Sequence, residues 1–485
     1  MAGIGFELKR IIKKDSLISM VSGAAYSALV VVGPTVIVMF TLLFLYSALG
    51  FMEITYAKRE LLSAAVLYVF IFAGIITTPV NTVFSRYVSD KIFEEKFEDI
   101  LPSFYSGRLI CQLAGGVLGI PFVIRLIIVG KVEIVFVAFM YMLYMSIITA
   151  FFALTYLTAT KDYRLIAIDF VLGMLVTIAW GLVSHNVFHI DVIYAILSGL
   201  SIGFGVISLL LIAYIRHYFR ESNDNYLECF SYFVKLKLLF FGSLFYVLGI
   251  YSHSFIFWGS KGNLMVAESF YSNQPYDMAV CLAMFTNISC NIIFTIMSET
   301  SFHDAYQKYV EKIIGATIKD IELAKKNMFK LLNQQIAYVV RIQAVISVII
   351  FLLAVIFLPD YGFSGLEMTI YPGLAAAFFC IFIMYCNNIF LCYFNDNTGV
   401  FLMGVIFLIG TVAGTLFSRT LDPQYYGLGP LFGALLGWTY SYFRIRFLER
   451  NFDYHIMCSM HVIKVNKGER PDSIVYKKQE IQNEN

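Results

Sequence analysis

The sequence predicts an all-α polytopic membrane protein, with about 12 transmembrane helices in two six-helix lobes. Three observations predict this fold class. Of the 485 residues, 59% are hydrophobic and only 14% are charged, whereas a water-soluble chain carries roughly 25% charged residues. Twelve apolar segments are long enough to cross a bilayer. The basic residues also alternate regularly between successive loops.

The first element is a basic amphipathic segment followed by a long apolar run. Within residues 1–16, four basic side chains lie on one face of a helix and apolar side chains on the other. This pattern is typical of a segment at an anionic cytoplasmic membrane surface. The apolar run continues from Leu17 to about Leu49, far beyond the roughly 7–15 residues of a signal-peptide core. We therefore expect a retained transmembrane helix.

Eleven further apolar segments follow in order, separated by polar loops. Backbone polar groups in hydrocarbon must be satisfied within their own segment, so each segment is predicted to be a helix. The segments lie at about 61–88, 103–128, 132–158, 163–184, 190–215, 235–258, 276–299, 336–358, 368–394, 398–418 and 427–447.

The distribution of Lys and Arg predicts the orientation in the membrane. With the amino terminus in the cytoplasm, 29 of the 35 basic residues fall on the cytoplasmic side, as the positive-inside rule requires. Moving one predicted helix would scramble this asymmetry in every later loop. We expect a multi-pass protein of the cytoplasmic membrane with both termini cytoplasmic. The other side receives only Lys58, Arg59, Arg125, Lys131, Lys261 and Arg419.

A polar stretch near the middle of the chain divides the spans into six and six. An even division is typical of a duplicated transporter whose lobes are related by an axis along the membrane normal. The predicted parts are a cytoplasmic amphipathic segment, an N-terminal lobe, a cytoplasmic linker, a C-terminal lobe and a cytoplasmic tail. They occupy residues 1–16, 17–215, 216–234, 235–448 and 449–485.

The C-terminal lobe contains a predicted cytoplasmic amphipathic helix at 303–333. Its apolar residues recur at three- and four-residue steps, with lysines and acids elsewhere. Such a helix either lies on the inner membrane surface or docks another protein, and the sequence supports both interpretations equally.

Several enzymatic chemistries are not indicated. The sequence has no G-x-x-x-x-G-K-[ST] phosphate loop and no D-x-D pair for a metal-bound sugar nucleotide. Its cysteines form no C-x-x-C pair and are expected to be buried apolar residues. His185 and His189 have a metal-ligand spacing but lie in a short external loop. We expect no enzyme activity, no cofactor and no metal.

Polar residues inside the predicted spans are the candidates for a substrate pathway. An ionised side chain near the bilayer centre costs about 2.5–3.5 kcal/mol on insertion scales, so such groups usually face a partner or a water-filled cavity. The alternative is bonding between packed helices, worth about 0.6 kcal/mol per contact. Both interpretations stay open. The candidates are Asn81, Arg86, Asp169, Asn287, Asn291, Glu299 and Asn387.

The predicted outer loops carry nine acidic residues against six basic ones. An acidic exit mouth that attracts a cationic substrate explains the excess, and so does the simple retention of Lys and Arg inside. The candidate mouth acids are Glu268, Asp277 and Glu367.

The opening "MAGIGFELKR", followed by "SLISMVSGAAYSALVVVGPTVIV", resembles the N-terminus of the PelG family of exopolysaccharide transporters. This resemblance implies membership of the multidrug/oligosaccharidyl-lipid/polysaccharide exporter superfamily, whose two lobes enclose a cavity that opens alternately to either side. It implies export of Pel, a cationic, N-acetylgalactosamine-rich polymer, across the cytoplasmic membrane. It also implies the glycosyltransferase PelF and the membrane proteins PelD and PelE as partners. It assigns no role to any single residue.

Two other classes of function stay open. One keeps transport but changes the cargo, as in a lipid-linked oligosaccharide flippase or a cation-coupled small-molecule exporter. The other is a non-transporting scaffold that organises the polymer synthase. A hydrated passage between the lobes favours transport, whereas an interior packed with side chains favours the scaffold.

Overall fold

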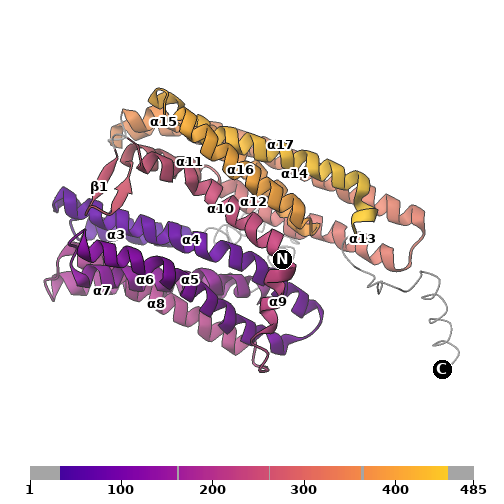
Figure 1. Ribbon diagram of the computed structural model, residues 1–485, viewed down its shortest axis with the longest axis horizontal. Coiled ribbons are helices and arrows are strands. Elements are labelled where there is room, and N and C mark those ends of the chain that lie inside the picture. The colour runs from indigo at the N-terminus through magenta and orange to yellow at the C-terminus, as the bar shows by residue number, and fades with distance from the viewer. Residues whose placement is uncertain (1–32, 161–162, 261–262, 362–364, 457–485) are drawn as a thin grey trace, which may run out of the picture.

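The computed structural model describes residues 33–160, 163–260, 263–361 and 365–456. The predicted segment 1–16 and residues 457–485 of the predicted tail 449–485 lie outside these ranges, whereas the first residues of that tail continue α17. Two long helical bundles lie side by side, one from each half of the chain (Figure 1). The apolar, nearly charge-free segments form helices because a helix satisfies its backbone polar groups internally.

The described residues of the N-terminal lobe form six long helices and two short 3₁₀ turns. The turns, η1 (Phe51–Glu53) and η2 (Phe97–Asp99), precede the second and third helices. The helices are α3 (Gly33–Ala48), α4 (Tyr56–Phe93), α5 (Ile100–Ile128), α6 (Ile134–Thr160), α7 (Tyr163–Asn186) and α8 (Val192–Tyr218).

The C-terminal lobe begins after a short linker helix, α9 (Glu228–Lys235), and its second span is broken into two helices. Its long elements are α10 (Lys237–Trp258), α11 (Gln274–Phe285), α12 (Ile288–Met297), α14 (Ile318–Phe357), α15 (Leu366–Tyr393), α16 (Asn397–Ser418) and α17 (Leu428–Tyr454). The smaller elements are β1 (Leu264–Val266), β2 (Phe270–Ser272), the π turn η3 (Ser298–Phe302), α13 (His303–Gly315), η4 (Leu358–Tyr361) and η5 (Pro423–Tyr425).

The helices of the two lobes pack in the same pairs, which confirms the prediction of two six-helix lobes. In each lobe the first span packs against the fifth, the fifth against the sixth, and the fourth against the sixth. The second and third spans both pack against the fourth. These pairs are α3/α7, α7/α8, α6/α8, α4/α6 and α5/α6 in one lobe, and α10/α16, α16/α17, α15/α17, α11/α15 and α14/α15 in the other.

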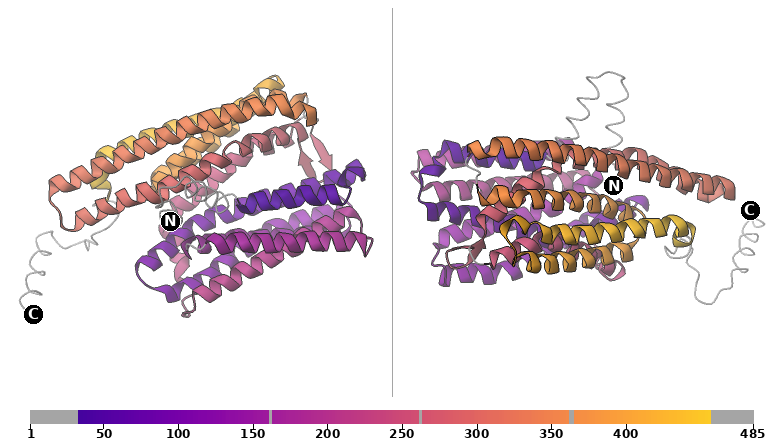
Figure 2. Two further views of the ribbon diagram at one scale, coloured as in Figure 1. Left: turned by 180° about the vertical axis from the view of Figure 1, so that it is seen from behind. Right: turned by 90° about the horizontal axis from the view of Figure 1, so that it is seen from above.

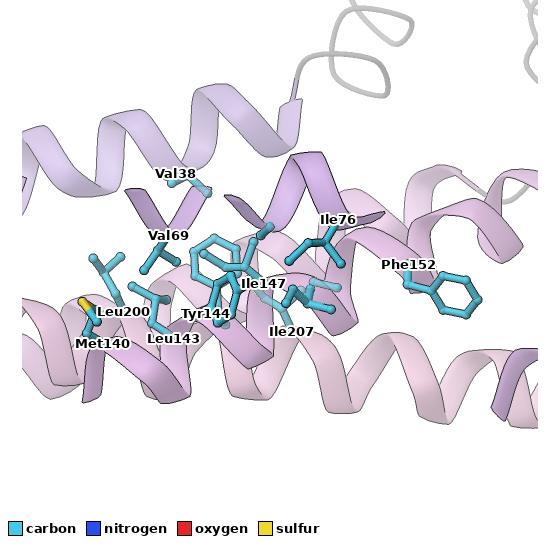
Figure 3. Close-up of a cluster of buried hydrophobic side chains, with 14 of the residues drawn as sticks. Val38, Val69, Ile76, Met140, Leu143, Tyr144, Ile147, Phe152, Leu200 and Ile207 are labelled. Carbon is cyan, nitrogen blue, oxygen red and sulfur yellow. The ribbon is translucent and has the colours of Figure 1, made fainter. Parts of the chain in front are cut away.

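Aliphatic and aromatic side chains from several helices fill the core of the N-terminal lobe. Val69 and Ile76 of α4, Ile147 of α6 and Leu200 of α8 are buried together (Figure 3). Glycine permits close contact between α7 and α8, since a Cβ atom at Gly173 of α7 would lie 2.8 Å from a carbonyl oxygen of α8. Contacts of this kind are typical of closely packed protein interiors.

Nine helices in the described part of the chain are long and apolar enough to cross a membrane. The remaining predicted spans correspond to α3, to the broken pair α11 and α12, and to α17. The chain is thus a multi-pass membrane protein. Helix α4 has 38 residues and is therefore longer than the roughly 30 Å thickness of a hydrocarbon core.

Three regions differ from the sequence-based expectations. The helix expected at 303–333 is two helices, because the chain turns at Gly315 and Thr317 caps the next helix by accepting a hydrogen bond from the Asp320 backbone N–H. The second of these continues into the ninth span as one 40-residue helix, α14. The linker expected at 216–234 contains α9, and the span expected at 276–299 breaks before Ile288.

The two ends of the molecule differ in structure. β1 and β2 form an antiparallel hairpin in which Met265 pairs with Tyr271, and this hairpin lies between the lobes at one end (Figure 1). At the other end, α13 and the start of α14 project beyond the N-terminal lobe (Figure 2). We refer to these as the hairpin end and the α13 end.

Candidate functional site

The interface between the lobes is built on α4 and α10, which pack against each other. They run antiparallel, because Tyr68 meets Trp258 and Phe72 meets Phe255. Both helices belong to the half of their lobe that faces the other lobe (Figure 1). These two helices therefore form part of the interface between the lobes.

An aromatic cluster joins the lobes at the hairpin end. The Tyr68 ring stacks on Trp258 with centroids 4.8 Å apart, and it meets the Phe270 ring edge-on at 5.0 Å. Its hydroxyl donates to the Tyr271 carbonyl oxygen at 2.8 Å and accepts from the Tyr271 backbone N–H at 2.9 Å. One side chain of the N-terminal lobe thus holds the hairpin of the C-terminal lobe by both its ring and its hydroxyl.

Trp258 is held in place by Asp277 at the start of α11. The indole N–H donates to both carboxylate oxygens, at 3.0 and 2.9 Å. The backbone N–H of Asn273 also donates to this carboxylate, at 3.1 Å. Tyr68 and Trp258 were not among the predicted site residues. A single aromatic residue in an apolar span looks the same in the sequence whether it packs in the core of a lobe or contacts the other lobe.

The turn of the hairpin adds a second contact between the lobes. Arg125 at the end of α5 donates to the Glu268 carbonyl oxygen at 3.1 Å. A Cβ atom at Gly130 would lie 2.6 Å from the Ala267 carbonyl oxygen, so glycine is needed there. Both Ala267 and Glu268 have a φ of 47°, a left-handed conformation that costs energy in residues with a side chain.

A stripe of small and hydroxylated residues runs along one flank of α4. Gly74, Thr78, Ser85 and Ser89 recur at helical spacing and are half-buried. The Thr78 and Ser89 hydroxyls donate to carbonyl oxygens one turn earlier, at 2.7 and 2.8 Å, which leaves their lone pairs free to accept. A Cβ atom at Gly74 would meet no described heavy atom within 4 Å. This flank thus combines hydroxyl groups with free acceptor capacity and open space beside Gly74.

Arg86 continues this region toward the α13 end. Its guanidinium pairs with Asp90 at 3.2 Å, and both side chains are more than a third exposed. Burial raises the pKa of the Tyr306 hydroxyl on α13, and the Arg86 guanidinium partly offsets that increase. Arg86 therefore lies within electrostatic range of the other lobe.

Three of the predicted pathway asparagines bond within their own lobe. The Asn81 amide donates to the Phe151 carbonyl oxygen of α6 at 3.1 Å. The Asn287 amide donates to the Phe378 carbonyl oxygen of α15 at 3.0 Å, and the buried Asn387 amide donates to the Ser441 hydroxyl at 3.0 Å. In this conformation these amides join helices. The amide oxygens of Asn81 and Asn387 have no hydrogen-bond partner among the described residues.

The break in the eighth span explains the position of Asn287. Gln343 of α14 donates to the Thr286 carbonyl oxygen at 3.3 Å and to the Asn287 side-chain oxygen at 2.7 Å. The first of these bonds satisfies a backbone carbonyl that a continuous helix would have satisfied internally. Asn287 therefore lies at the break, whereas Asn291 lies in α12 and Glu299 in the π turn η3.

The remaining predicted pathway residues are less constrained. Asn291 is half-buried and its side-chain oxygen has no partner among the described residues. Asp169, half-buried near the start of α7, makes no ion pair with any described residue. The Glu299 side chain lies outside the described part of the molecule. Contact of any of these residues with a substrate stays a prediction.

The three predicted mouth acids have different environments. Glu268 is exposed at the tip of the hairpin. Glu367 is half-buried in the first turn of α15. Asp277 is engaged by Trp258 and the Asn273 backbone, which makes it part of the contact between the lobes. In the described ranges no group of three or more His, Cys, Asp or Glu side chains could hold a metal ion.

The linker helix α9 is fixed to the N-terminal lobe at the α13 end. The buried Lys91 ammonium donates to Asp99 at 2.6 Å and to Glu228 of α9 at 2.7 Å. The Tyr232 ring of α9 meets Tyr87 of α4 edge-on at 4.9 Å. Helix α10 begins two residues after α9 ends. This short connection therefore links the N-terminal lobe, to which α9 is fixed, with the C-terminal lobe, which α10 begins.

Comparison with known proteins supports a transporter fold. A family model described as "PelG: Putative exopolysaccharide Exporter (EPS-E)" matches residues 1–457. No curated protein matches the chain.

Several solved transporter structures share the fold. An outward-facing multidrug resistance MATE family transporter of the MOP superfamily superimposes with a TM-score of 0.60 at 13% identity, covering 87% of this chain and 96% of that chain. A eukaryotic MATE transporter gives 0.59 at 10% identity, with 90% and 99% covered. A MOP superfamily transporter from Pyrococcus furiosus gives 0.54 at 11% identity, with 87% and 96% covered. At these identities the likeness concerns the fold alone.

Proposed function

The chain belongs to the PelG family of exopolysaccharide exporters, and from this premise we propose that it exports a cationic, N-acetylgalactosamine-rich polymer between its two lobes. The family and the fold are those of transporters. The polymer, the passage and the partners are our proposal.

The observation that carries the proposal is the half-buried polar flank of α4 at the lobe interface. Hydroxyl groups at membrane depth are tolerated where they bond to backbone or line a hydrated space. Thr78 and Ser89 bond to their own helix and keep acceptor capacity, and the space beside Gly74 holds no described atom. A sugar polymer needs such a surface, because each hydroxyl that it buries without a partner is costly.

We assign the hairpin end to the outside and the α13 end to the cytoplasm. The assignment rests on the excess of Lys and Arg in the loops near α9, α13 and the C-terminus. In this orientation the aromatic cluster around Tyr68 closes the exit, and Arg86 lies near the entrance. Exposed Glu268 and half-exposed Glu367 are then placed to attract a cationic polymer as it leaves.

The chain has no phosphate loop that would bind a nucleotide. Polymer synthesis in the cytoplasm is therefore the energy source that we assign to export. A synthase that elongates the polymer would push it through the interface. The partners implied by the family resemblance are the glycosyltransferase PelF and the membrane proteins PelD and PelE. The projecting helices α13 and the start of α14 are the docking surface that we assign to them. Their apolar sides already pack on α15 and α17 through Tyr309, Phe329 and Phe452, so their polar sides face outward.

The test places a bulky side chain in the proposed passage. In a Pel-producing host that lacks its own exporter, Gly74→Trp should abolish secreted polymer and leave polymer inside the cell, with unchanged protein level. Val117→Trp, on an exposed apolar face of α5, is the matched control and should secrete normally. Normal secretion by the Gly74→Trp variant would refute the passage along α4.

A second assay separates cargo classes. Membrane vesicles containing the protein should move the polymer and should not accumulate small amphipathic cations when a proton or sodium gradient is imposed. Gradient-dependent accumulation would favour a small-molecule exporter. Export that survives Gly74→Trp and fails when α13 is altered would favour a scaffold.

A further inference from the structure

A pocket of about 240 Å³ lies within the N-terminal lobe beside the aromatic cluster. It is bounded by α4, α5 and α6. Gly119 of α5, which has no side chain, leaves space in the pocket beside two tyrosine rings of α6. A Cβ atom at Gly119 would lie 3.1 Å from the Tyr144 ring and 3.2 Å from the Tyr141 ring. Figure 3 shows Val69, Met140 and Tyr144 of its lining next to the buried core.

The pocket lies on the flank of α4 opposite the polar stripe. Val69, which lines it, and Thr78, in the stripe, are nine residues apart, which is about two and a half turns of helix. The two side chains therefore leave α4 in opposite directions. The pocket is thus separate from the proposed sugar passage.

The depth of the pocket corresponds to the hydrocarbon of one membrane leaflet. Its α5 residues, from Leu118 to Val123, precede the end of α5 at Ile128 by five to ten residues, or about 8 to 15 Å. On the same helix Leu118 is 62% exposed and Val117 is 71% exposed. Exposed apolar side chains at this depth of a membrane protein face lipid, so the pocket adjoins the bilayer rather than water.

The lining suits a hydrocarbon chain and does not suit a sugar. It consists of aliphatic and aromatic side chains, glycine and methionine, and contains no charged residue. The polar side-chain atoms in this lining are tyrosine hydroxyls, and one of these, on Tyr68, is already bonded to Tyr271. A saccharide ring would lose its hydrogen bonds to water there, whereas an alkyl chain loses none.

We propose that this pocket binds one acyl chain of a bilayer phospholipid from the leaflet at the hairpin end. The chain would pack against Tyr68 and Phe72, which meet Trp258 and Phe255 of the other lobe on their remaining sides. Bound lipid therefore supports the contact between the lobes at the hairpin end. The inference does not depend on which cargo the protein exports.

Tryptophan fluorescence tests the site directly. Trp258 is only 4% exposed and lies one ring away from the pocket. A variant with Trp180→Phe and Trp438→Phe leaves Trp258 as the single tryptophan among the three of this chain. Reconstituted in nanodiscs of phosphatidylcholine with dibrominated acyl chains, this protein should lose at least half of its emission relative to nanodiscs of unbrominated lipid, because bromine quenches only at close range.

The matched pair for this experiment is Val123→Phe against Val117→Phe. Val123 lines the pocket and Val117 lies on the same helix outside it. A phenylalanine ring at position 123 would occupy part of the pocket and obstruct the acyl chain, so Val123→Phe should restore most of the emission, whereas Val117→Phe should be quenched like its parent. Equal quenching in both variants would mean that ordinary surrounding lipid reaches Trp258 and would overturn the proposal. Absence of quenching in the parent would overturn it as well.

Thermal unfolding in detergent supplies an independent readout if a variant folds poorly. Added phosphatidylcholine should raise the melting temperature of the parent and of Val117→Phe by several degrees. The added lipid should change the melting temperature of Val123→Phe only a little, because the phenylalanine ring obstructs the pocket in that variant. A lipid response of the same size in all three proteins would contradict the site.

Discussion

Tyr68 of α4 and Trp258 of α10 stack with their ring planes only 9° apart and their centroids 4.8 Å apart. This pair lies at the hairpin end of the interface, and each ring is anchored by a polar group of the C-terminal lobe. Tyr271 bonds the Tyr68 hydroxyl, and Asp277 bonds the Trp258 indole. A rocking motion that opens this end must separate the two rings and break the bonds of Tyr68 to the hairpin.

The first prediction concerns the Tyr68 hydroxyl. Tyr68→Phe removes two hydrogen bonds to Tyr271, each worth about 0.5–1.5 kcal/mol, while it keeps the ring. Amide hydrogen exchange in the hairpin, residues 264–272, should therefore become about tenfold faster. Tyr338→Phe, at an exposed tyrosine of α14, is the control. Exchange as slow as in the unmodified protein would show that the hairpin is held by other contacts.

The second prediction distinguishes Asp277 from Glu268. Asp277→Ala leaves the Trp258 indole N–H and the Asn273 N–H without their acceptor, and each such loss costs about 1–3 kcal/mol. The melting temperature should fall and the Trp258 emission should shift to longer wavelength as water reaches the ring. Glu268→Gln should leave both quantities unchanged, since that side chain is exposed. If Glu268 belongs to an acidic exit, Glu268→Gln should reduce polymer secretion while the melting temperature and the Trp258 emission stay unchanged.

The third prediction concerns the buried charge on Lys91. Lys91→Met leaves Asp99 and Glu228 without their cation, and breaking a buried pair in this way costs about 3–5 kcal/mol. The linker helix α9 should then detach from α4. Lys96→Met, which breaks an exposed pair with Glu94, should cost no more than about 1 kcal/mol.

Alkylation of Cys229 reports this detachment. Cys229 is buried in α9, and burial raises the pKa of its thiol to about 11. At neutral pH the thiol is protonated and covered, so N-ethylmaleimide should modify it slowly in the unmodified protein and in Lys96→Met. Lys91→Met should speed the modification by at least tenfold. Equal rates in all three proteins would show that the ion pairs do not hold α9.

The fourth prediction compares two glycines. A Cβ atom at Gly433 of α17 would lie 2.1 Å from the Thr411 hydroxyl oxygen and 2.5 Å from the Thr411 backbone nitrogen. Gly433→Ala should therefore force α16 and α17 apart and destabilise the protein by about 1–3 kcal/mol. Gly74→Ala meets no described atom and should leave the melting temperature unchanged or slightly higher. A loss of stability in Gly74→Ala would show that the flank of α4 is packed.

Much of the helical framework could be predicted from the sequence, because the bilayer imposes one rule on every span. Apolar length predicted α5, α10 and α16 to within three residues at each end. The same rule failed at the eighth span, where Gln343, 56 positions away from Asn287, supplies the bonds that permit a break. Helical periodicity, which predicted one helix at 303–333, failed for a different reason, since a turn at Gly315 interrupts a continuous amphipathic pattern.

The sequence predicted less about the candidate site than about the helical framework. Polarity at membrane depth predicted Asn81 and Arg86 as pathway residues of the second span, since polar groups there are rare, and their contact with a substrate stays a prediction. It could not tell whether an asparagine faces a passage or joins two helices. Asn81, Asn287 and Asn387 all bond within their lobes in this conformation, and their contact with a substrate stays a prediction.

The sequence alone determined the class of molecule, the number of spans and their division into two halves, because hydropathy and charge are properties of single segments. The tertiary structure decided which residues meet across the interface. Tyr68 and Trp258 are 190 positions apart, and nothing local to either residue specifies that their rings stack. That contact depends on how two separately packed lobes fit together, and this fit depends on all the helices of both lobes at once.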